Sequence, residues 1–133
     1  MARDGDDWPT LVSTQKYTPG PSSGFSPGVL IVPETARAFV GAGQRLLCYD
    51  QHTNKRLWED HADVGFLHWG RTKHHVYMLA EIEFAVWTAS GEKRWTTFVD
   101  PPTRIECTDD NVTLHMFDNK TMTHRLSDGQ PLP

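Results

Sequence analysis

The sequence predicts an all-β fold, built as an antiparallel meander of three four-stranded repeats. From Val29 onward, short runs rich in β-branched and aromatic residues alternate with turn residues, and none has the apolar spacing of a long helix. A similar phrase also occurs three times, at residues 48–58, 85–95 and 124–132, with a period of 37–38 residues. A fixed period of this size indicates stacked β units.

The chain divides into two regions of different composition. Its 133 residues fit one domain that is large enough for a core without metal or disulfide support. Residues 1–27 hold four prolines and a Gly/Ser-rich run, so we expect a flexible arm there, with a short strand at 8–13 and Trp8 and Phe25 as anchors. Residues 28–133 form the predicted repeat domain.

Eleven strands are expected in the repeat domain, separated by turn residues. Their predicted ranges are 29–32, 36–41, 45–50, 55–59, 64–69, 74–79, 84–88, 93–98, 104–107, 111–117 and 121–126. Asn54, Gly91 and Gly129 align in the tight turn of the repeated phrase, and both residue types tolerate positive φ. Four antiparallel strands in about 37 residues is the size of one propeller blade.

The repeated phrase resembles the tryptophan-docking repeat of quinoprotein-type β-propellers, in which a small residue, an Asp, a Thr-Gly-Lys turn and a Trp recur. In the first copy Cys48 is the small residue, Asp50 the Asp, 53–55 the turn and Trp58 the Trp. The second copy keeps its Trp95 but lacks the Asp, and the chain stops where the third Trp would fall. The resemblance covers roughly residues 29–133.

The resemblance implies that each Trp lays its indole on the next blade and supplies burial between blades. We therefore expect Trp58→Ala or Trp95→Ala to cost about 3–5 kcal/mol and to leave the protein insoluble or molten. The quinone enzymes of the family use a vicinal disulfide and acidic calcium ligands. Cys48 and Cys107 are not adjacent and no matching acidic cluster stands out, so no cofactor is expected.

Three repeats are fewer than the four blades of the smallest usual ring, and they leave two open sheet edges. The sheets then fold over one another as a compact sandwich, or two chains complete a ring, or the N-terminal arm covers an edge. We expect a compact domain with propeller-like repeats, and a homodimer through the open edges is the alternative.

Four histidines lie close together in the sequence, and they raise the question of a metal. His68 and His74 can meet across a hairpin, and Asp63 or His61 would add a third ligand of the kind zinc accepts. His75 points to the other face of the strand from its neighbour. The spacing matches no metal motif, so we expect exposed or hydrogen-bonded histidines and no metal.

The remaining reactive residues also favour a protein without catalysis. Cys48 and Cys107 are expected to be reduced thiols packed as small apolar residues. Glu81 and Glu83 share a strand face, which is expected to be the solvent side of a hairpin. No nucleophile motif or phosphate-binding loop is present. The protein is therefore not expected to be an enzyme.

The predicted binding residues are exposed or rigid positions in loops and turns. Two prolines follow Asp100, and Pro101 stiffens the loop that leaves a strand. We expect Asp100 and Pro101 to form a binding rim together with Trp69 and the turn at Asp109 and Asp110.

The leading hypothesis is a non-catalytic protein-binding module that presents a rigid β-repeat surface, such as an inhibitor or immunity-type protein. The net charge of −4 and the scattered basic residues argue against nucleic acid and favour a basic protein partner. The sequence has no membrane-spanning stretch or signal-like segment, so we expect no membrane partner and a cytoplasmic location. The alternative is a small metal-dependent or ligand-binding enzyme that uses the His61–His75 region.

Overall fold

The structure, a computed structural model, describes residues 27–62, 65–100, 102, 104–116 and 118–132. In these residues, twelve strands form three four-stranded sheets. Sheet 1 contains β1 (Gly28–Val32), β2 (Arg37–Ala42), β3 (Arg45–Asp50) and β4 (Lys55–His61), with the 3-10 turn η1 (Pro33–Thr35) after β1. Sheet 2 contains β5 (Phe66–Arg71), β6 (His75–Ala80), β7 (Glu83–Thr88) and β8 (Lys93–Phe98). Sheet 3 contains β9 (Arg104–Cys107), β10 (Asn111–His115), β11 (Thr121–Arg125) and β12 (Pro131–Leu132).

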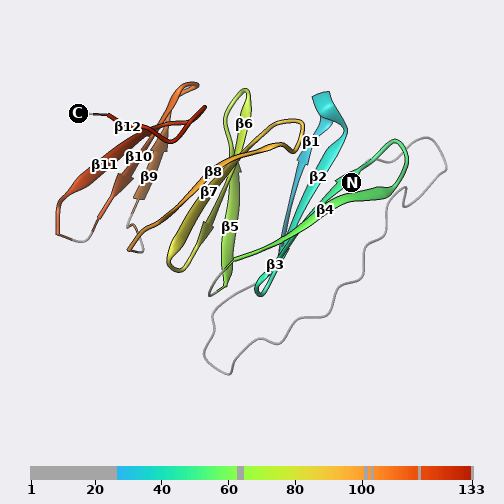
Figure 1. The fold of residues 1–133 in the computed structure, drawn as a ribbon, viewed down its shortest axis with the longest axis horizontal. Coiled ribbons are helices and arrows are strands. Elements are labelled where there is room, and N and C mark those ends of the chain that lie inside the picture. The colour runs from blue at the N-terminus through green and yellow to red at the C-terminus, as the bar shows by residue number, and fades with distance from the viewer. Residues whose placement is uncertain (1–26, 63–64, 101, 103, 117, 133) are drawn as a thin grey trace.

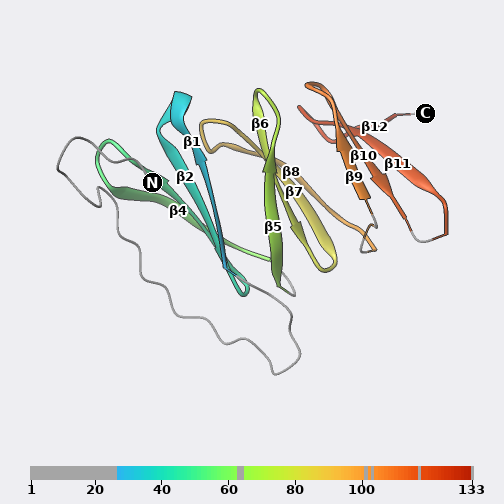
Figure 2. The same cartoon turned by 180° about the vertical axis from the view of Figure 1, so that it is seen from behind.

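Each sheet is an antiparallel meander in which neighbouring strands follow one another along the chain. The three sheets lie side by side in sequence order, with sheet 2 between the other two (Figure 1), and the reverse view shows the same order (Figure 2). This architecture confirms the predicted all-β fold of three four-stranded, propeller-like repeats.

The predicted strand boundaries agree closely with the structure. The ranges 45–50, 93–98 and 104–107 are identical to β3, β8 and β9, and most others differ by one or two residues at an end. The short β12 and the turn η1 were not predicted. The N-terminal arm, apart from Pro27, and its strand at 8–13 lie outside the described residues. The described part of the chain contains no helix long and apolar enough to cross a membrane.

The tight turns have the backbone that the repeated phrase requires. Asn54 has φ 58°, Gly91 97° and Gly129 75°, so all three occupy the left-handed region predicted for them. A Cβ on Gly129 would lie 2.6 Å from a ring carbon of Trp95, which shows how closely the indole approaches the turn of the next sheet.

Two apolar layers hold the sheets together, one on each face of sheet 2. The layer between sheets 1 and 2 is formed by Val32, Phe39, Leu46, Cys48, Ala62, Phe66, Val76, Met78, Ala80, Ala85 and Trp87. The layer between sheets 2 and 3 is formed by Leu79, Phe84, Val86, Val99, Val112, Leu114 and Leu126. Sheet 2 is therefore apolar on both faces, as the central layer of a stack must be.

An indole docks across each of these two layers. Trp58 of sheet 1 stacks on Trp87 of sheet 2, with ring centroids 5.3 Å apart and planes at 8°. Its Nε1–H donates to the carbonyl of Gly91 at 2.7 Å. Trp95 of sheet 2 repeats the arrangement on sheet 3, where its Nε1–H donates to the carbonyl of Leu126 at 2.7 Å. The prediction that each indole leans on the neighbouring repeat is confirmed.

Candidate functional site: a cross-tied loop rim

Six loops meet at one end of the three sheets and form the candidate site. We call this surface the cross-tied rim and define it as residues 33–36, 51–54, 72–74, 89–92, 108–110 and 126–130. They lie at the same end because a meander places every second connection there. In each sheet the two rim loops are joined by a backbone hydrogen bond of 2.8–2.9 Å. The donors are Gln51, Ala89 and Leu126, and the respective acceptors are Ala36, His74 and Asp110.

Side chains tie the rim loops of sheet 1 to those of sheet 2. The Thr35 hydroxyl donates to the carbonyl of Ala89 at 2.7 Å. The Arg37 guanidinium, from the first position of β2, donates to the next carbonyl, that of Ser90, at 2.8 Å. Because these partners are more than fifty residues apart in sequence, the ties fix the position of one repeat's loops relative to the next.

An ion pair adds a further tie between sheets 1 and 2. Arg71, at the end of β5, forms two hydrogen bonds to the Glu34 carboxylate of η1, at 3.1 and 2.5 Å. The hydrogen bond from Arg71 is the largest cause that lowers the pKa of Glu34, to about 2. Two parallel hydrogen bonds of this kind fix the orientation of the carboxylate as well as its distance.

The rim loops of sheets 2 and 3 are tied in a similar way. Arg94 donates to the carbonyl of Ser127 at 3.1 Å, beside the indole bond of Trp95. Burial lowers the pKa of the neighbouring His75, the charges of His74 and Arg94 lower it further, and the Asp110 carboxylate acts in the opposite direction. The rim is thus a continuous surface of loops whose positions are fixed by contacts within and between sheets.

The predicted binding residues do not come together. Asp109 and Asp110 are exposed on the cross-tied rim. Asp100 is exposed at the opposite end of the sheets, because it follows Val99, whose N–H bonds the carbonyl of Ile82 in the β6–β7 turn. Pro101 lies outside the described residues. The binding role of these residues stays a prediction, but a single rim cannot contain both Asp100 and the aspartate pair.

Trp69 lies within a strand and not in the loops at either end of the sheets. It is at the middle of β5 and packs against the layer between sheets 1 and 2. Its ring contacts those of Phe39, Phe66 and Trp87, with centroids 5.4–5.5 Å apart. Its buried Nε1–H has no hydrogen-bond partner among the described residues. Its geometry is that of a partly buried core residue, and its predicted binding role is untested.

The histidines are spread over different surroundings. His61 lies on β4 of sheet 1, 3.9 Å from the Glu59 carboxylate, whereas His68 lies on β5 of sheet 2 with its ring edge-on to Tyr77. Burial lowers the pKa of His68. Within the described ranges, which omit Asp63, no group of three His, Cys, Asp or Glu side chains could hold a metal ion.

Glu83 and the two cysteines differ in their exposure to solvent. Glu83 is buried and accepts a hydrogen bond from Thr96 at 2.9 Å, so the expectation that it faces solvent beside Glu81 is wrong. Both cysteines are free thiols. Cys48 is buried in the layer beneath Trp58, and burial raises the pKa of its thiol to about 12, whereas Cys107 is exposed.

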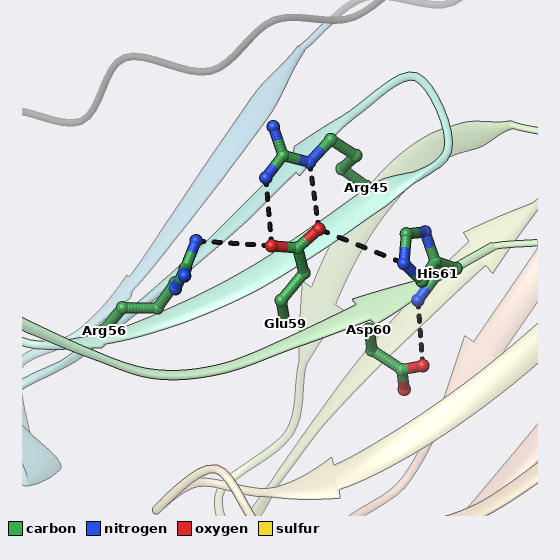
Figure 3. A network of polar contacts seen from close by, with 5 residues as sticks. All are labelled: Arg45, Arg56, Glu59, Asp60 and His61. Carbon is green, nitrogen blue, oxygen red and sulfur yellow. Dashed lines mark hydrogen bonds and ion pairs between the residues drawn. The ribbon is translucent and has the colours of Figure 1, made fainter.

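A second surface is the face of sheet 1 that points away from sheet 2, which we call the outer face. Its centre is apolar. Charged side chains of β3 and β4 form a network of polar contacts beside it (Figure 3). Arg45 forms two hydrogen bonds to the Glu59 carboxylate, at 3.0 and 2.9 Å, and Arg56 adds a third at 3.2 Å. These arginines lower the pKa of Glu59, with the Arg45 hydrogen bond as the largest cause.

Comparisons with known proteins support the fold. No protein-family model and no curated protein matches the sequence. Among solved structures, the chain is similar to HIRA(644-1017), with 16% identity, a TM-score of 0.57, and coverage of 86% of this chain and 39% of that one. It is also similar to BamB from Moraxella catarrhalis, with 15% identity, a TM-score of 0.52, and coverage of 74% and 32%.

A europium-containing methanol dehydrogenase is also similar, with 12% identity, a TM-score of 0.57, and coverage of 80% of this chain and 23% of that one. BamB and methanol dehydrogenase are propeller proteins. The chain spans less than two fifths of the length of each of these three structures. At these identities the likeness concerns the fold, which is propeller-like.

Proposed function

We propose that this protein is a non-catalytic protein-binding module that presents the cross-tied rim to a protein partner. The observation that carries the proposal is the set of ties between loops of different sheets, from Thr35, Arg37, Arg71 and Arg94. A surface whose loops are already fixed loses less conformational entropy when it binds. Propeller-like architecture, which offers such loop ends, is consistent with an interaction scaffold.

The charge of the sheet 3 end of the rim indicates the kind of partner. Asp109 and Asp110 are adjacent and exposed, and neither forms an ion pair with another described residue. Together with the net charge of −4, they would steer a basic protein toward this end. An inhibitor or immunity-type role is the form of binding that we favour for a chain of this size and charge.

We also propose that the three sheets are repeats of the quinoprotein-type, tryptophan-docking kind. The repeated phrase places Trp58 and Trp95 after the left-handed turn, and both indoles donate to a carbonyl in the tight turn region of the next sheet. The proposal concerns the repeat and not the quinone chemistry of the enzymes that contain it.

A charge-reversal pair tests the proposed function. The double variant Asp109→Lys/Asp110→Lys alters the rim, and Glu81→Lys/Asp118→Lys makes the same charge change at exposed positions of the opposite end. Affinity capture with the full chain, followed by a binding assay with the purified partner, should show binding lost in the first variant and kept in the second. Loss of binding only in the second variant, or a bound metabolite in place of a protein, would contradict the proposal.

A further inference from the structure

The outer face of sheet 1 is more deeply buried than the end of a stack should be. Its central residues Ala38, Leu47 and Tyr49 are 1%, 0% and 8% exposed, and Ile31 and Val40 pack against them. All five come from sheet 1 itself. The strands of a sheet shield their side chains only from the sides, so burial this complete requires a further layer on top.

Sheets 2 and 3 cannot supply this layer, because sheet 2 packs on the opposite face of sheet 1. That opposite face contains Phe39, Leu46 and Cys48, whose side chains alternate with those of the outer face along β2 and β3. Sheet 3 in turn packs on the far side of sheet 2. The exposed fractions are those of the single chain without a partner, so the layer over the outer face has to come from another part of the same chain.

The register of the sheets shows what the outer face is shaped to receive. Tyr49 pairs with Ala38 in sheet 1, as Trp87 pairs with Val76 in sheet 2. In sheet 3 the same place is held by His124. The repeat therefore puts Tyr49, Trp87 and His124 at one equivalent position.

At two of these three equivalent positions an indole from the preceding sheet lies on the ring. Trp58 stacks on Trp87, and the ring of Trp95 lies over His124 with centroids 5.5 Å apart. In both cases the ring at this position is a platform on which the tryptophan of the preceding sheet lies. By the same geometry, Tyr49 is the platform for a tryptophan that comes before β1.

A second copy of the chain that packs head-to-tail fits this face poorly. The face of sheet 3 that would meet it is polar, since the hydroxyls of Thr113 and Thr123 bond each other there at 3.0 Å and Glu106 pairs with Arg104 at 2.9 Å. In addition, Leu132 stands opposite Thr123 where sheets 1 and 2 carry their docking tryptophans. A head-to-tail dimer would thus bring no indole to Tyr49.

We propose that the segment before β1 covers the outer face, with the indole of Trp8 on the ring of Tyr49. Residues 8–13 combine this Trp with Leu11 and Val12, the apolar content that the face requires. About fifteen residues separate this stretch from β1, and when extended they reach up to about 50 Å, more than the width of a four-stranded sheet. Because the segment is tethered beside the face, its effective concentration there is high.

The charged border of the face suits this occupant. The Arg45, Arg56 and Glu59 network lies along the β4 side of the apolar centre, as charged groups lie at the polar rim of an interface. Asp4, Asp6 and Asp7 come just before Trp8 in the sequence, and docking of Trp8 on this face would bring acidic groups toward the two arginines. The inference is independent of the partner proposed for the cross-tied rim.

Photo-crosslinking in the full chain tests the inference directly. A benzophenone side chain replaces Trp8, and in a control chain it replaces Phe98, which is 70% exposed at the end of β8. The Trp8 probe should link within the same chain to peptides that contain residues 37–50, and the control probe should not. Links to a second chain, or to no residue of sheet 1, would overturn the inference.

Nitration of Tyr49, read by mass spectrometry, gives a second test that does not depend on the probe. Trp8→Ala should raise the nitration rate of Tyr49 by roughly tenfold or more, because loss of a docked indole shifts a local opening equilibrium by at least that factor. Trp8→Phe, which keeps a ring, should raise it less. The nitration of Tyr77, between sheets 2 and 3, is the internal control. Equal nitration of Tyr49 in all variants would overturn the inference.

Discussion

Replacement of Trp58 by alanine removes the contact that joins sheet 1 to sheet 2. The indole stacks on Trp87, meets Phe39 edge-on with centroids 6.1 Å apart, and donates to the carbonyl of Gly91. Each aromatic pair contributes about 0.5–1.5 kcal/mol beyond area burial, and the hydrogen bond about 1 kcal/mol. With the lost burial of a half-buried indole, the expected cost is about 3–5 kcal/mol.

Urea unfolding followed by circular dichroism measures this cost. With a slope of about 2 kcal/mol per molar for a domain of this size, the midpoint should fall by about 2 M. Leu57→Ala is the matched control, since the neighbouring side chain is 45% exposed and its loss should cost below about 1 kcal/mol. If Trp58→Ala is too unstable to fold, Trp58→Phe keeps one ring and loses the hydrogen bond and part of the indole's contact area, so its midpoint should fall less. An unchanged midpoint in Trp58→Ala would refute the docking role.

Three further predictions follow from single features of the fold. Gly129→Ala should cost about 1–3 kcal/mol in thermal or urea unfolding, because its Cβ meets an indole and its φ is 75°, whereas Asn54→Ala at an equivalent exposed turn meets no such ring and should cost less. The lowered pKa of Glu34 means that its pair with Arg71 stabilises the fold above pH 4.5, and this stability is lost as the pH falls toward about 2. In Arg71→Gln, an NMR titration should show the Glu34 pKa back near its ordinary value, and the loss of stability over that pH range should be smaller. A Glu34 pKa that stays as low in Arg71→Gln as in the parent protein would contradict the pairing. The Cys48 thiol, with its pKa raised to about 12, should react with a disulfide reagent at pH 8 only on unfolding. Burial also raises the pKa of the Cys107 thiol, but this residue is exposed and should react in the folded protein; equal rates for the two cysteines would contradict the burial of Cys48.

The repeat architecture could be read from the sequence because local signals and long-range packing agree there. The left-handed turns at Asn54, Gly91 and Gly129 and the tryptophans after the first two turns recur in register. The turn residues have a local role, and each tryptophan docks on the matching position of the next repeat, so the same period marks both. The short β12 was missed because its two residues, Pro131 and Leu132, carry almost no strand signal of their own.

The candidate site was harder to predict because it depends on which loops share an end of the sheets. In a meander, successive connections alternate between ends, so Asp100 and the pair Asp109 and Asp110 fall on opposite sides of β9. That alternation was a usable signal. The ties made by Arg37 and Arg71 were not predictable, since their partners lie in other repeats and their side chains carry no motif.

Trp69 and Glu83 show a different limit. An exposed and a buried tryptophan look alike in sequence, and the burial of Trp69 depends on rings from two other strands and another sheet. Glu83 is buried because Thr96 of the neighbouring strand supplies a hydroxyl donor, a pairing fixed only by the register of β7 and β8.

The central claim, that each repeat docks an indole on the next, is tested most directly by a nuclear Overhauser spectrum of the labelled protein. The claim predicts cross-peaks from the Trp58 indole N–H to Gly91 and to the Trp87 ring, and from the Trp95 indole N–H to Leu126. Cross-peaks that place both indoles within their own repeats, or no contacts at either indole, would contradict it.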